Sequence, residues 1–527
     1  MKTKDIQRLI IGLILFSFVA GKSFSQQRYW VFLKDKKGVE FDPISYFDKK
    51  AIERRQRLHL PVFTESDCPL NSDYVRMIEK TAGKIISQSR WLNAVTVNIP
   101  QNKLEAVAKL DFVSGIKPVE LEENPAFCQK GESELSELKM ELLVKQTKRM
   151  GGDIFEKNGI DGKGVRIAIF DGGFPGVDIS PVFEHLRREG RIIKTWDFVR
   201  NREFVYGSIT HGTMVLSCIA GIYKNERMGL ATGAEFLLAR TEQKGEPFSE
   251  EENWMAAVEW ADKNGADIIN SSLGYTYRRY FPNDMNGRTS LVAKAANIAA
   301  SKGILVVNAM GNDGNKLWEF MGTPADADSV LSVGGIDPKT DFHISFSSYG
   351  PTSDMRRKPN VSAYAEVIAW KKDKPARVQG TSFSTPLVAG FAACVMQLNP
   401  GLTNMEIFHL VEQSGHLYPY YDYAHGYGIP QARYFFQHDD SLICDSIVQF
   451  RYSGDTIRVM VNENISLDTC FTDNLLYYHL ENKNGVLEHY TVVQAYKHDV
   501  IDFLGDADIN DKILRVNFKG CTIEHKF

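Results

Sequence analysis

The chain of 527 residues is 43% hydrophobic and 24% charged, which is typical of a soluble globular protein. A chain of this length is too long to fold around one hydrophobic core, so we expect two or three domains. The 62 basic and 66 acidic side chains give a formal net charge of −4, which excludes an electrostatic argument for nucleic acid or an anionic membrane as a partner.

The first 25 residues have the order of a secretory signal peptide. Three basic residues, Lys2, Lys4 and Arg8, precede the apolar run 9–16, and small residues follow it. The run is short for a membrane span and no cysteine follows it to carry a lipid, although an uncleaved anchor stays the alternative. We therefore expect residues 1–25 to be removed, leaving a protein without a membrane span that is secreted, periplasmic or held at the cell surface.

Residues 26–119 are predicted to form a small α/β domain. Strand-like runs lie at 28–33 and 90–99, and helical spacing is found at 45–58 and 101–110. A segment of about ninety residues is large enough to fold alone.

The remaining chain divides into three parts. Residues 120–141 carry many glutamates and few large apolar residues, which indicates an exposed linker, placed at 120–150, with room for one helix. In residues 151–437, apolar and β-branched runs such as 165–170 and 304–308 alternate with helical stretches, which predicts a parallel sheet covered on both faces. Residues 438–527 are short strands and turns, typical of a small all-β module.

The seven cysteines are too few for a disulfide scaffold. Cys218 and Cys394 lie in small-residue apolar runs and are predicted to be buried free thiols. Cys444, Cys470 and Cys521 share the last part of the chain, and an oxidising compartment favours one bridge among them. The spacing leaves open which two form it.

Three polar residues occupy positions that suit nucleophilic catalysis by serine, which needs a hydroxyl, a histidine base and an orienting carboxylate. Asp171 follows the strand-like run 165–170 on a glycine turn, where a carboxylate can enter the crevice of an α/β sheet. His211 stands before the apolar helix predicted at 215–222. Ser382 opens a small-residue helix, where backbone N–H groups and the helix dipole favour a developing oxyanion.

A fourth residue, Asn312, follows the strand-like run 304–308, and its amide can donate to an oxyanion beside the backbone N–H of Ser382. Taken singly, each residue has an ordinary structural explanation. Asp171 and Asn312 suit turns, one histidine is usually structural, and Ser382 or Ser384 would serve as a helix N-cap. The order Asp, His, Ser with fitting context on all three favours catalysis.

Five segments, in this order, resemble the signature segments of the subtilase family of serine proteases: 169–173 (IFDGG), 211–213 (HGT), 271–274 (SSLG), 311–312 (GN) and 380–386 (GTSFSTP). The resemblance covers about residues 157–437. It implies a doubly wound, mostly parallel sheet and binding of substrate backbone by Ser272, Leu273 and Gly274. It also implies that structural calcium is frequent, although no calcium site can be assigned, and no cofactor is required for the chemistry. Residues 29–119 resemble the inhibitory propeptides of the same family.

Two positions depart from the family pattern. Gly172 stands where the family usually has Ser or Thr, which removes a side chain near the Asp171 carboxylate and is expected to loosen its orientation. Ser384 stands where alanine is common, a small change.

The sequence therefore predicts a secreted serine endopeptidase that is made as a zymogen, acts on proteins or peptides, and has its own prodomain as an inhibitor. One alternative is a catalytically inactive surface-binding protein that retains the protease fold, although no member of the catalytic set is missing. Another is a hydrolase of small esters, which the segment 271–274 disfavours because its backbone suits an extended peptide. Side-chain specificity stays open, since pocket depth depends on loops such as 275–288.

Overall fold

The computed structural model describes residues 26–119, residues 137–436 except 244, 246 and 278, and residues 444–527 except 454–455, 468–473 and 505–510. The predicted signal peptide, the first half of the predicted linker and Cys470 lie outside the described residues. Contacts divide the described chain into two compact units. The first holds residues 26–41 and 65–119, and the second holds residues 42–64 and everything from 137 onward.

The first unit is a four-stranded antiparallel sheet with helices, in the strand order β2-β3-β1-β4. Its elements are β1 (Gln26–Leu33), α4 (Ser72–Ala82), β2 (Ile85–Ser89), β3 (Ala94–Pro100), α5 (Leu104–Ala108) and β4 (Val113–Pro118). Alternate residues of the two central strands, Val31, Val95, Val97 and Ile99, are fully buried in one core. The α/β character predicted for this region is confirmed.

The helix predicted at 45–58 belongs to the second unit. It is divided into α2 (Pro43–Tyr46) and α3 (Lys49–Arg57), because Asp48 leaves the helical conformation and becomes the N-cap of α3. The N-cap carboxylate accepts a hydrogen bond from the backbone N–H of Lys50 at 2.9 Å. Residues 42–64 therefore interrupt the first unit in the sequence and pack elsewhere.

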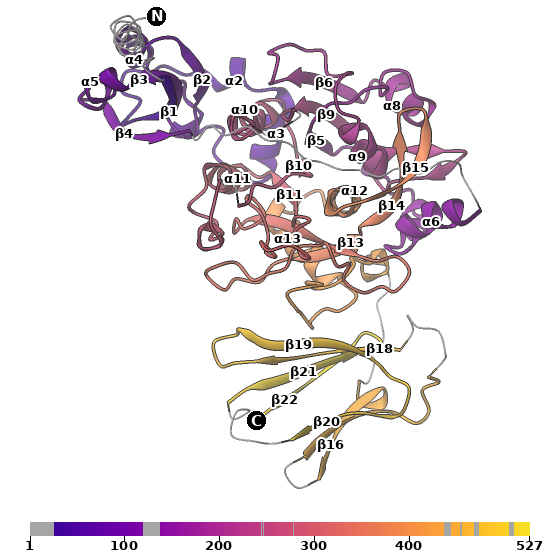
Figure 1. Ribbon diagram of the computed structural model, residues 1–527. Coiled ribbons are helices and arrows are strands. Elements are labelled where there is room, and N and C mark those ends of the chain that lie inside the picture. The colour runs from indigo at the N-terminus through magenta and orange to yellow at the C-terminus, as the bar shows by residue number, and fades with distance from the viewer. Residues whose placement is uncertain are drawn as a thin grey trace, which may run out of the picture. The chain divides into compact units, whose positions relative to one another are not determined.

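The second unit is built on a seven-stranded parallel sheet in the order β13-β12-β11-β10-β5-β9-β6 (Figure 1). Its strands are β5 (Arg166–Asp171), β6 (Ile192–Asp197), β9 (Glu235–Arg240), β10 (Ile268–Ser271), β11 (Leu305–Ala309), β12 (Val330–Ile336) and β13 (Val361–Tyr364). Every residue of β5, β10, β11, β12 and β13 is buried, which explains their continuous apolar character. The predicted parallel sheet is confirmed.

The strand order reverses direction between β5 and β10, because the chain builds β6 and β9 on one side of β5 and then β10 to β13 on the other. Such a reversal opens a crevice beyond the carboxyl ends of the two strands, which is where ligands bind in open α/β sheets. The helices of the sheet form pairs: α9 (His211–Ala220) packs against α12 (Thr381–Leu398), and α10 (Ser249–Lys263) packs against α11 (Leu291–Ser301).

Among the described residues, one helix, α12, is long and apolar enough to cross a membrane by length and composition. However, 83% of its apolar window is buried inside the protein. Its residues from Thr381 to Val395 are all buried, and several belong to the main hydrophobic core. We therefore interpret α12 as the central core helix of the second unit.

The described half of the predicted linker forms α6 (Glu137–Lys148), which packs in the second unit. Leu143 is fully buried, and the side chain of Gln146 is buried with it. The Gln146 amide donates to the carbonyl of Met228 at 2.7 Å and accepts from the backbone N–H of Ile368 at 2.8 Å. Gln146, which sequence composition does not single out, thus helps to hold this helix in the second unit together with buried Leu143 and with Lys145, which donates to the carbonyl of Pro338 at 2.6 Å.

The C-terminal residues form two antiparallel sheets, in the orders β16-β17-β20 and β19-β18-β21-β22, which confirms the predicted all-β module. Their strands are β16 (Val448–Ser453), β17 (Thr456–Val461), β18 (Leu475–Glu481), β19 (Leu487–Gln494), β20 (Asp499–Leu504), β21 (Ile513–Phe518) and β22 (Cys521–Lys526). A disulfide joins Cys444 to Cys521, with 5.2 Å between their Cα atoms. Cys218 and Cys394 are buried free thiols, as predicted, and burial raises the pKa of Cys218 to about 12.

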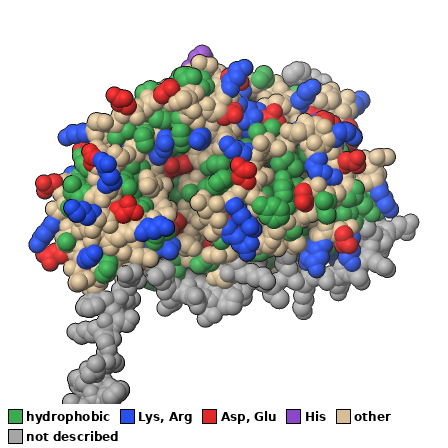
Figure 2. Space-filling view, turned by 90° about the horizontal axis from the view of Figure 1, so that it is seen from above, with side chains coloured by type: hydrophobic (Ala, Val, Ile, Leu, Met, Phe, Trp, Pro, Cys, Tyr) green, Lys and Arg blue, Asp and Glu red, His purple; other side chains and the backbone are tan. Residues whose placement is uncertain are grey.

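The charge balance of the sequence is visible on the surface. On the face shown in Figure 2, basic and acidic side chains are interspersed among hydrophobic ones, and neither sign forms a continuous patch. This face offers no basic stripe of the kind that tracks a phosphate backbone.

Candidate active site

The predicted catalytic residues lie on elements that meet at the carboxyl edge of the sheet. Asp171 is the last residue of β5, and Ser272 follows the last residue of β10, so both flank the reversal of strand order. His211 is the first residue of α9, and Ser382 is the second residue of α12.

Asp171 and His211 form a close pair. The Nδ1 atom of His211 lies 2.8 Å from Oδ2 of Asp171. The carboxylate is fully buried and can only accept, so Nδ1 carries the proton and donates, which leaves Nε2 as the free basic nitrogen. Burial by itself lowers the pKa of His211, but the charge of Asp171 and its hydrogen bond outweigh this effect, and the pKa is raised above its usual value.

Close backbone approach makes this pair possible. A Cβ atom placed on Gly212 would lie 2.5 Å from the carbonyl oxygen of Gly173 and 2.9 Å from the Cβ of Asp171. Any larger residue at position 212 would therefore push the start of α9 away from the end of β5.

The structure gives a physical reason for Gly172, where the family usually has Ser or Thr. A Cβ atom at this position would lie 3.0 Å from two side-chain carbons of Ile209, so the isoleucine occupies the space that a side chain would need. The backbone N–H of Gly172 donates to Oδ1 of Asp171 at 2.7 Å, while Oδ2 is held by His211. Both carboxylate oxygens are thus bonded, one of them by a backbone N–H that does not depend on the side chain at position 172, and the expected loosening of Asp171 stays a prediction.

Ser382 is 5% exposed, and its hydroxyl donates to the carbonyl oxygen of Ser272 at 3.2 Å. In return, the hydroxyl of Ser272 donates to the carbonyl oxygen of Ser382 at 2.9 Å. The ring of His211 lies 5.4 Å from that of Phe383, the next residue along α12. The Ser382 hydroxyl, which donates to Ser272 here, must therefore give up this bond to donate to His211.

The neighbouring Ser384 differs from Ser382 in accessibility. Its side chain is fully buried, and its hydroxyl has no hydrogen-bond partner within the described part of the chain. A reagent or substrate would reach Ser382 before Ser384.

Asn312 is oriented by a residue that sequence reasoning missed. The backbone N–H of Thr381 donates to Oδ1 of Asn312 at 2.9 Å, and the Thr381 hydroxyl donates to the same atom at 3.1 Å. Because two donors hold Oδ1, the amide is turned so that Nδ2 is left to donate to another group. The threonine stands beside Ser382 in the sequence, but nothing local pairs it with a residue about seventy positions earlier.

The predicted substrate segment, Ser272 to Gly274, is held on both sides. Ser272 is bonded to Ser382 as described, and the carbonyl of Leu273 accepts from Nδ2 of Asn308 at 2.9 Å. Tyr275, the next residue, forms an isolated antiparallel bridge with Thr323. Gly274 is exposed, so part of this segment is open to pairing with an extended chain.

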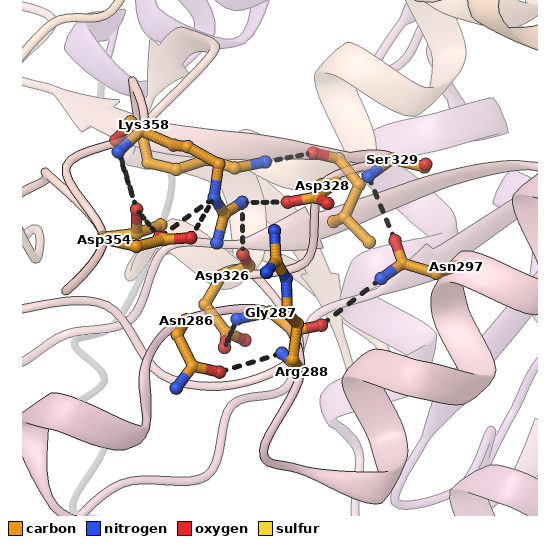
Figure 3. A network of polar contacts seen from close by, with 12 residues as sticks. Asn286, Gly287, Arg288, Asn297, Asp326, Asp328, Ser329, Asp354 and Lys358 are labelled. Atoms are coloured by element: carbon orange, nitrogen blue, oxygen red, sulfur yellow. Dashed lines mark hydrogen bonds and ion pairs between the residues drawn. The ribbon is translucent and has the colours of Figure 1, made fainter.

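The loop that follows this segment is braced by the polar network in Figure 3. The side chain of Asp326 accepts from the backbone N–H of Gly287 at 2.7 Å, and Asn297 donates to the Gly287 carbonyl. Arg356 donates to the Asp326 carbonyl at 2.9 Å and pairs with Asp328. Loop 275–288, expected to set pocket depth, is thus tied to the segment before β12.

Among the residues that the structure describes, no group of three or more His, Cys, Asp or Glu side chains is placed to hold a metal ion. No residue is therefore assigned to the structural calcium that the resemblance allows, and no chemical step is derived through it.

Residues 162–428 match the model of the subtilase family, peptidase S8, and residues 28–133 match that of the peptidase S8 propeptide domain of the Bacteroidota. The first match covers half of the chain, and the chain belongs to the subtilase family. The resemblance found in the sequence is thereby confirmed.

Individual relatives share about a third of the matched positions. The subtilisin-like protease SBT6.1 of Arabidopsis thaliana is 32% identical over 48% of this chain and 23% of its own length. A thermophilic serine proteinase of a Bacillus strain is 31% identical over 48% of this chain and 56% of its own length. The chain thus spans less than two thirds of these relatives. The solved structure of MycP1 without its propeptide covers 56% of this chain and 97% of its own, at 23% identity and a TM-score of 0.45.

Proposed function

We propose that this chain is a serine endopeptidase that hydrolyses peptide bonds with Ser382 as the nucleophile. The observation that carries the proposal is the buried Asp171–His211 pair, joined at 2.8 Å, at the helix start that faces the end of β5. A buried carboxylate that fixes the tautomer of a histidine is the orienting part of a serine triad.

The reaction follows from these positions. The Ser382 hydroxyl leaves its hydrogen bond to the Ser272 carbonyl and gives its proton to Nε2 of His211 as the oxygen attacks the scissile carbonyl carbon. Asp171 holds the imidazolium in place and stabilises its charge. His211 then returns the proton to the leaving amine, and water repeats the two transfers to release the acid.

The negative charge that develops on the carbonyl oxygen needs donors. The backbone N–H of Ser382, near the positive end of α12, and Nδ2 of Asn312 serve this purpose in the proposal. An extended peptide would pair with the backbone of Ser272 to Gly274, where exposed Gly274 leaves room.

The propeptide domain supports synthesis as a precursor. We further propose that residues 1–25 direct the chain out of the cytoplasm, that the prodomain inhibits the enzyme until processing, and that proteins or peptides are the substrates. Many subtilases act outside the cell, which agrees with this proposal.

The test is labelling of the processed protein from culture medium with a fluorophosphonate probe, which reacts with activated serines. Wild type and the Ser384→Ala variant should be labelled, and Ser382→Ala should not. Ser384→Ala is the matched control, because it removes the other serine hydroxyl of the same helix turn. Labelling of Ser382→Ala would contradict the assignment, and an unlabelled wild type would favour the inactive binding protein.

A further inference from the structure

Residues 42–64 lie within the propeptide match, yet they pack with the catalytic unit. Helix α3 of this segment carries the basic sequence Glu53-Arg54-Arg55-Gln56-Arg57 and lies beside α10 (Figure 1). A run of charges usually indicates a solvated face, but Arg54 and Arg55 are each 1% exposed. Two buried guanidinium groups require specific partners.

Arg54 binds where two helices end. Its Nε donates to the carbonyl of Lys302, the C-cap residue of α11, at 3.2 Å. Its other nitrogens donate to the carbonyl of Ala266, just beyond the end of α10, and to the carboxylate of Asp262. The last carbonyls of a helix carry partial negative charge, so Arg54 satisfies the end of α11 at Lys302 and also binds the carbonyl of Ala266 and an acid in the last turn of α10.

Arg55 binds the same carboxylate from another side. Its Nη2 donates to Oδ2 of Asp262 at 2.7 Å, and its guanidinium carbon lies 4.1 Å from the ring centre of Phe47. The side chain of Asp262 is 1% exposed, so its charge is balanced by the two arginines of α3 and not by water.

Further contacts between residues 48–58 and the catalytic unit lie around the Asp262 site. Lys50 donates to the carbonyl of Gly164 at 2.7 Å, and Arg57 pairs with Asp267 at 3.1 Å. The backbone N–H of Asp48 donates to the carbonyl of Lys263 at 2.8 Å. Leu58 fits against Gly303 so closely that a Cβ there would lie 2.6 Å from its Cδ1. The surfaces of α3 and of the catalytic unit are therefore complementary in shape as well as in charge.

This site lies at the amino edge of the sheet. Ala266 lies two residues before β10 begins, and Lys302 lies three residues before β11 begins. Asp171 and the segment from Ser272 lie at the carboxyl edge, across a four-residue strand that spans roughly 13 Å. A ligand bound here leaves the catalytic crevice free.

We propose that Asp262, with the carbonyls of Ala266 and Lys302, forms a docking site whose occupant is the chain's own helix α3, and that this site retains the prosegment on the enzyme after the linker is cut. Asp262 lies in the last, partially negative turn of α10, and its ion pairs within the described part of the chain are with Arg54 and Arg55 of α3, so removal of α3 would leave a buried charge that disfavours an empty site. Cutting the linker alone would then not release the prosegment. This consequence for activation rests on the proposed function, but the retention itself does not.

The experiment uses the full chain with Ser382→Ala and a recognition sequence for a site-specific protease inserted between Glu123 and Ser133. After cleavage, gel filtration should show the N-terminal fragment eluting with the remainder. The double variant Arg54→Gln/Arg55→Gln should release the fragment on the order of 10²-fold faster, because each change leaves a buried charge without its partner. Because the chain is inactive, the result is independent of whether the protein is a protease.

The control neutralises two exposed cations of the same prosegment, in the double variant Arg76→Gln/Lys109→Gln. Their side chains are 74% and 73% exposed in pairs with Asp73 and Glu105, so this variant should retain the fragment like wild type. Immediate release of the wild-type fragment, or equal retention by the Arg54 and Arg55 double variant, would overturn the proposal.

A measurement without substitutions covers the case in which the double variant does not fold. Hydrogen exchange of the Ser382→Ala chain, before and after cleavage, should show the same protection for the amides of α3 and for Asp48, which donates to Lys263. Loss of that protection on cleavage would show that α3 leaves the site, and the proposal would be wrong.

Discussion

At the scale of the residue, the properties of His211 follow from one partner. Asp171 holds the proton on Nδ1 and raises the pKa of the ring, while burial acts in the opposite direction. The balance between charge and burial decides at what pH Nε2 is free to accept the proton of Ser382.

We expect the activity of the processed enzyme to rise with pH, because only neutral His211 can act as a base, with a midpoint above the ordinary histidine value of about 6.5. Asp171→Asn should lower kcat by about 10⁴, as in other serine triads. It should also move the midpoint of any residual activity downward, since burial then acts alone. A pH profile of kcat/KM for both proteins tests this, and full activity in Asp171→Asn would remove Asp171 from the mechanism.

Thr381 is a positioning residue for Asn312, and its role can be separated from folding. Thr381→Val removes the hydroxyl that donates to Oδ1 of Asn312 and keeps the shape of the side chain. We expect kcat to fall about fivefold with KM unchanged, the size of one hydrogen bond of about 1 kcal/mol. Asn312→Ala should cost about 10²–10³ in kcat, the size measured for this donor in subtilisin, a member of the same family.

The control for Thr381 is Thr385→Val, which removes a hydroxyl one turn later that donates to the Thr381 carbonyl and not to Asn312. It should leave kcat unchanged. In the Asn312→Ala background, Thr381→Val should have no further effect, because the amide it orients is gone. Additive losses in the double variant would mean that Thr381 acts by another route.

At the scale of the element, the first residue of strand β12 is hydrogen-bonded by the buried side chain of Lys358. Lys358 is 2% exposed, and its Nζ donates to the carbonyl of Val330, the first residue of β12, and to Asn360. Burial lowers the pKa of Lys358 to about 7, and the nearby charge of Arg356 adds to this. The folded protein therefore releases this proton at a pH where the unfolded chain still holds it.

Between pH 7 and about 10 the unfolded state binds more protons at this position, so the free energy of unfolding should rise with pH. Below pH 7 both states are protonated and the effect of Lys358 is constant. Lys358→Met should remove this part of the slope. Urea unfolding of Ser382→Ala chains at several pH values measures it, with the exposed Lys316→Met as control. Equal slopes with and without Lys358 would contradict the prediction.

At the scale of the whole molecule, the chain joins a propeptide domain, a catalytic sheet and an all-β module whose disulfide pairs residues 77 positions apart. Helix α6 packs within the catalytic unit, where Gln146 bonds the backbone of Met228 and of Ile368. Cleavage within α6 would cut an ordered helix that packs in the catalytic unit, which disfavours processing there.

We therefore expect N-terminal sequencing of the protein from culture medium to show a mature chain that begins between Glu120 and Glu137, within the predicted linker. The Ser382→Ala chain should remain uncut if the enzyme processes itself. A mature, active wild type that still begins near Gln26 would contradict the prodomain role. Processing that persists in Ser382→Ala would point to a separate protease.

The sequence by itself determined the fold class and the family, because both depend on local information. Buried parallel strands must be continuously apolar, and the segments around Asp171, His211 and Ser382 are short runs whose residue types are set by turns and helix starts. The same local patterns named every residue that the proposed mechanism uses.

Only the tertiary structure decided which distant groups meet. It paired Cys444 with Cys521, turned the Asn312 amide by means of Thr381, and filled the space at Gly172 with Ile209. It also buried the basic run of α3 against Asp262, where the charge pattern alone indicated a solvated surface. The reason is that such contacts depend on how the chain folds in three dimensions, and no local sequence pattern relates residues that lie more than two hundred positions apart.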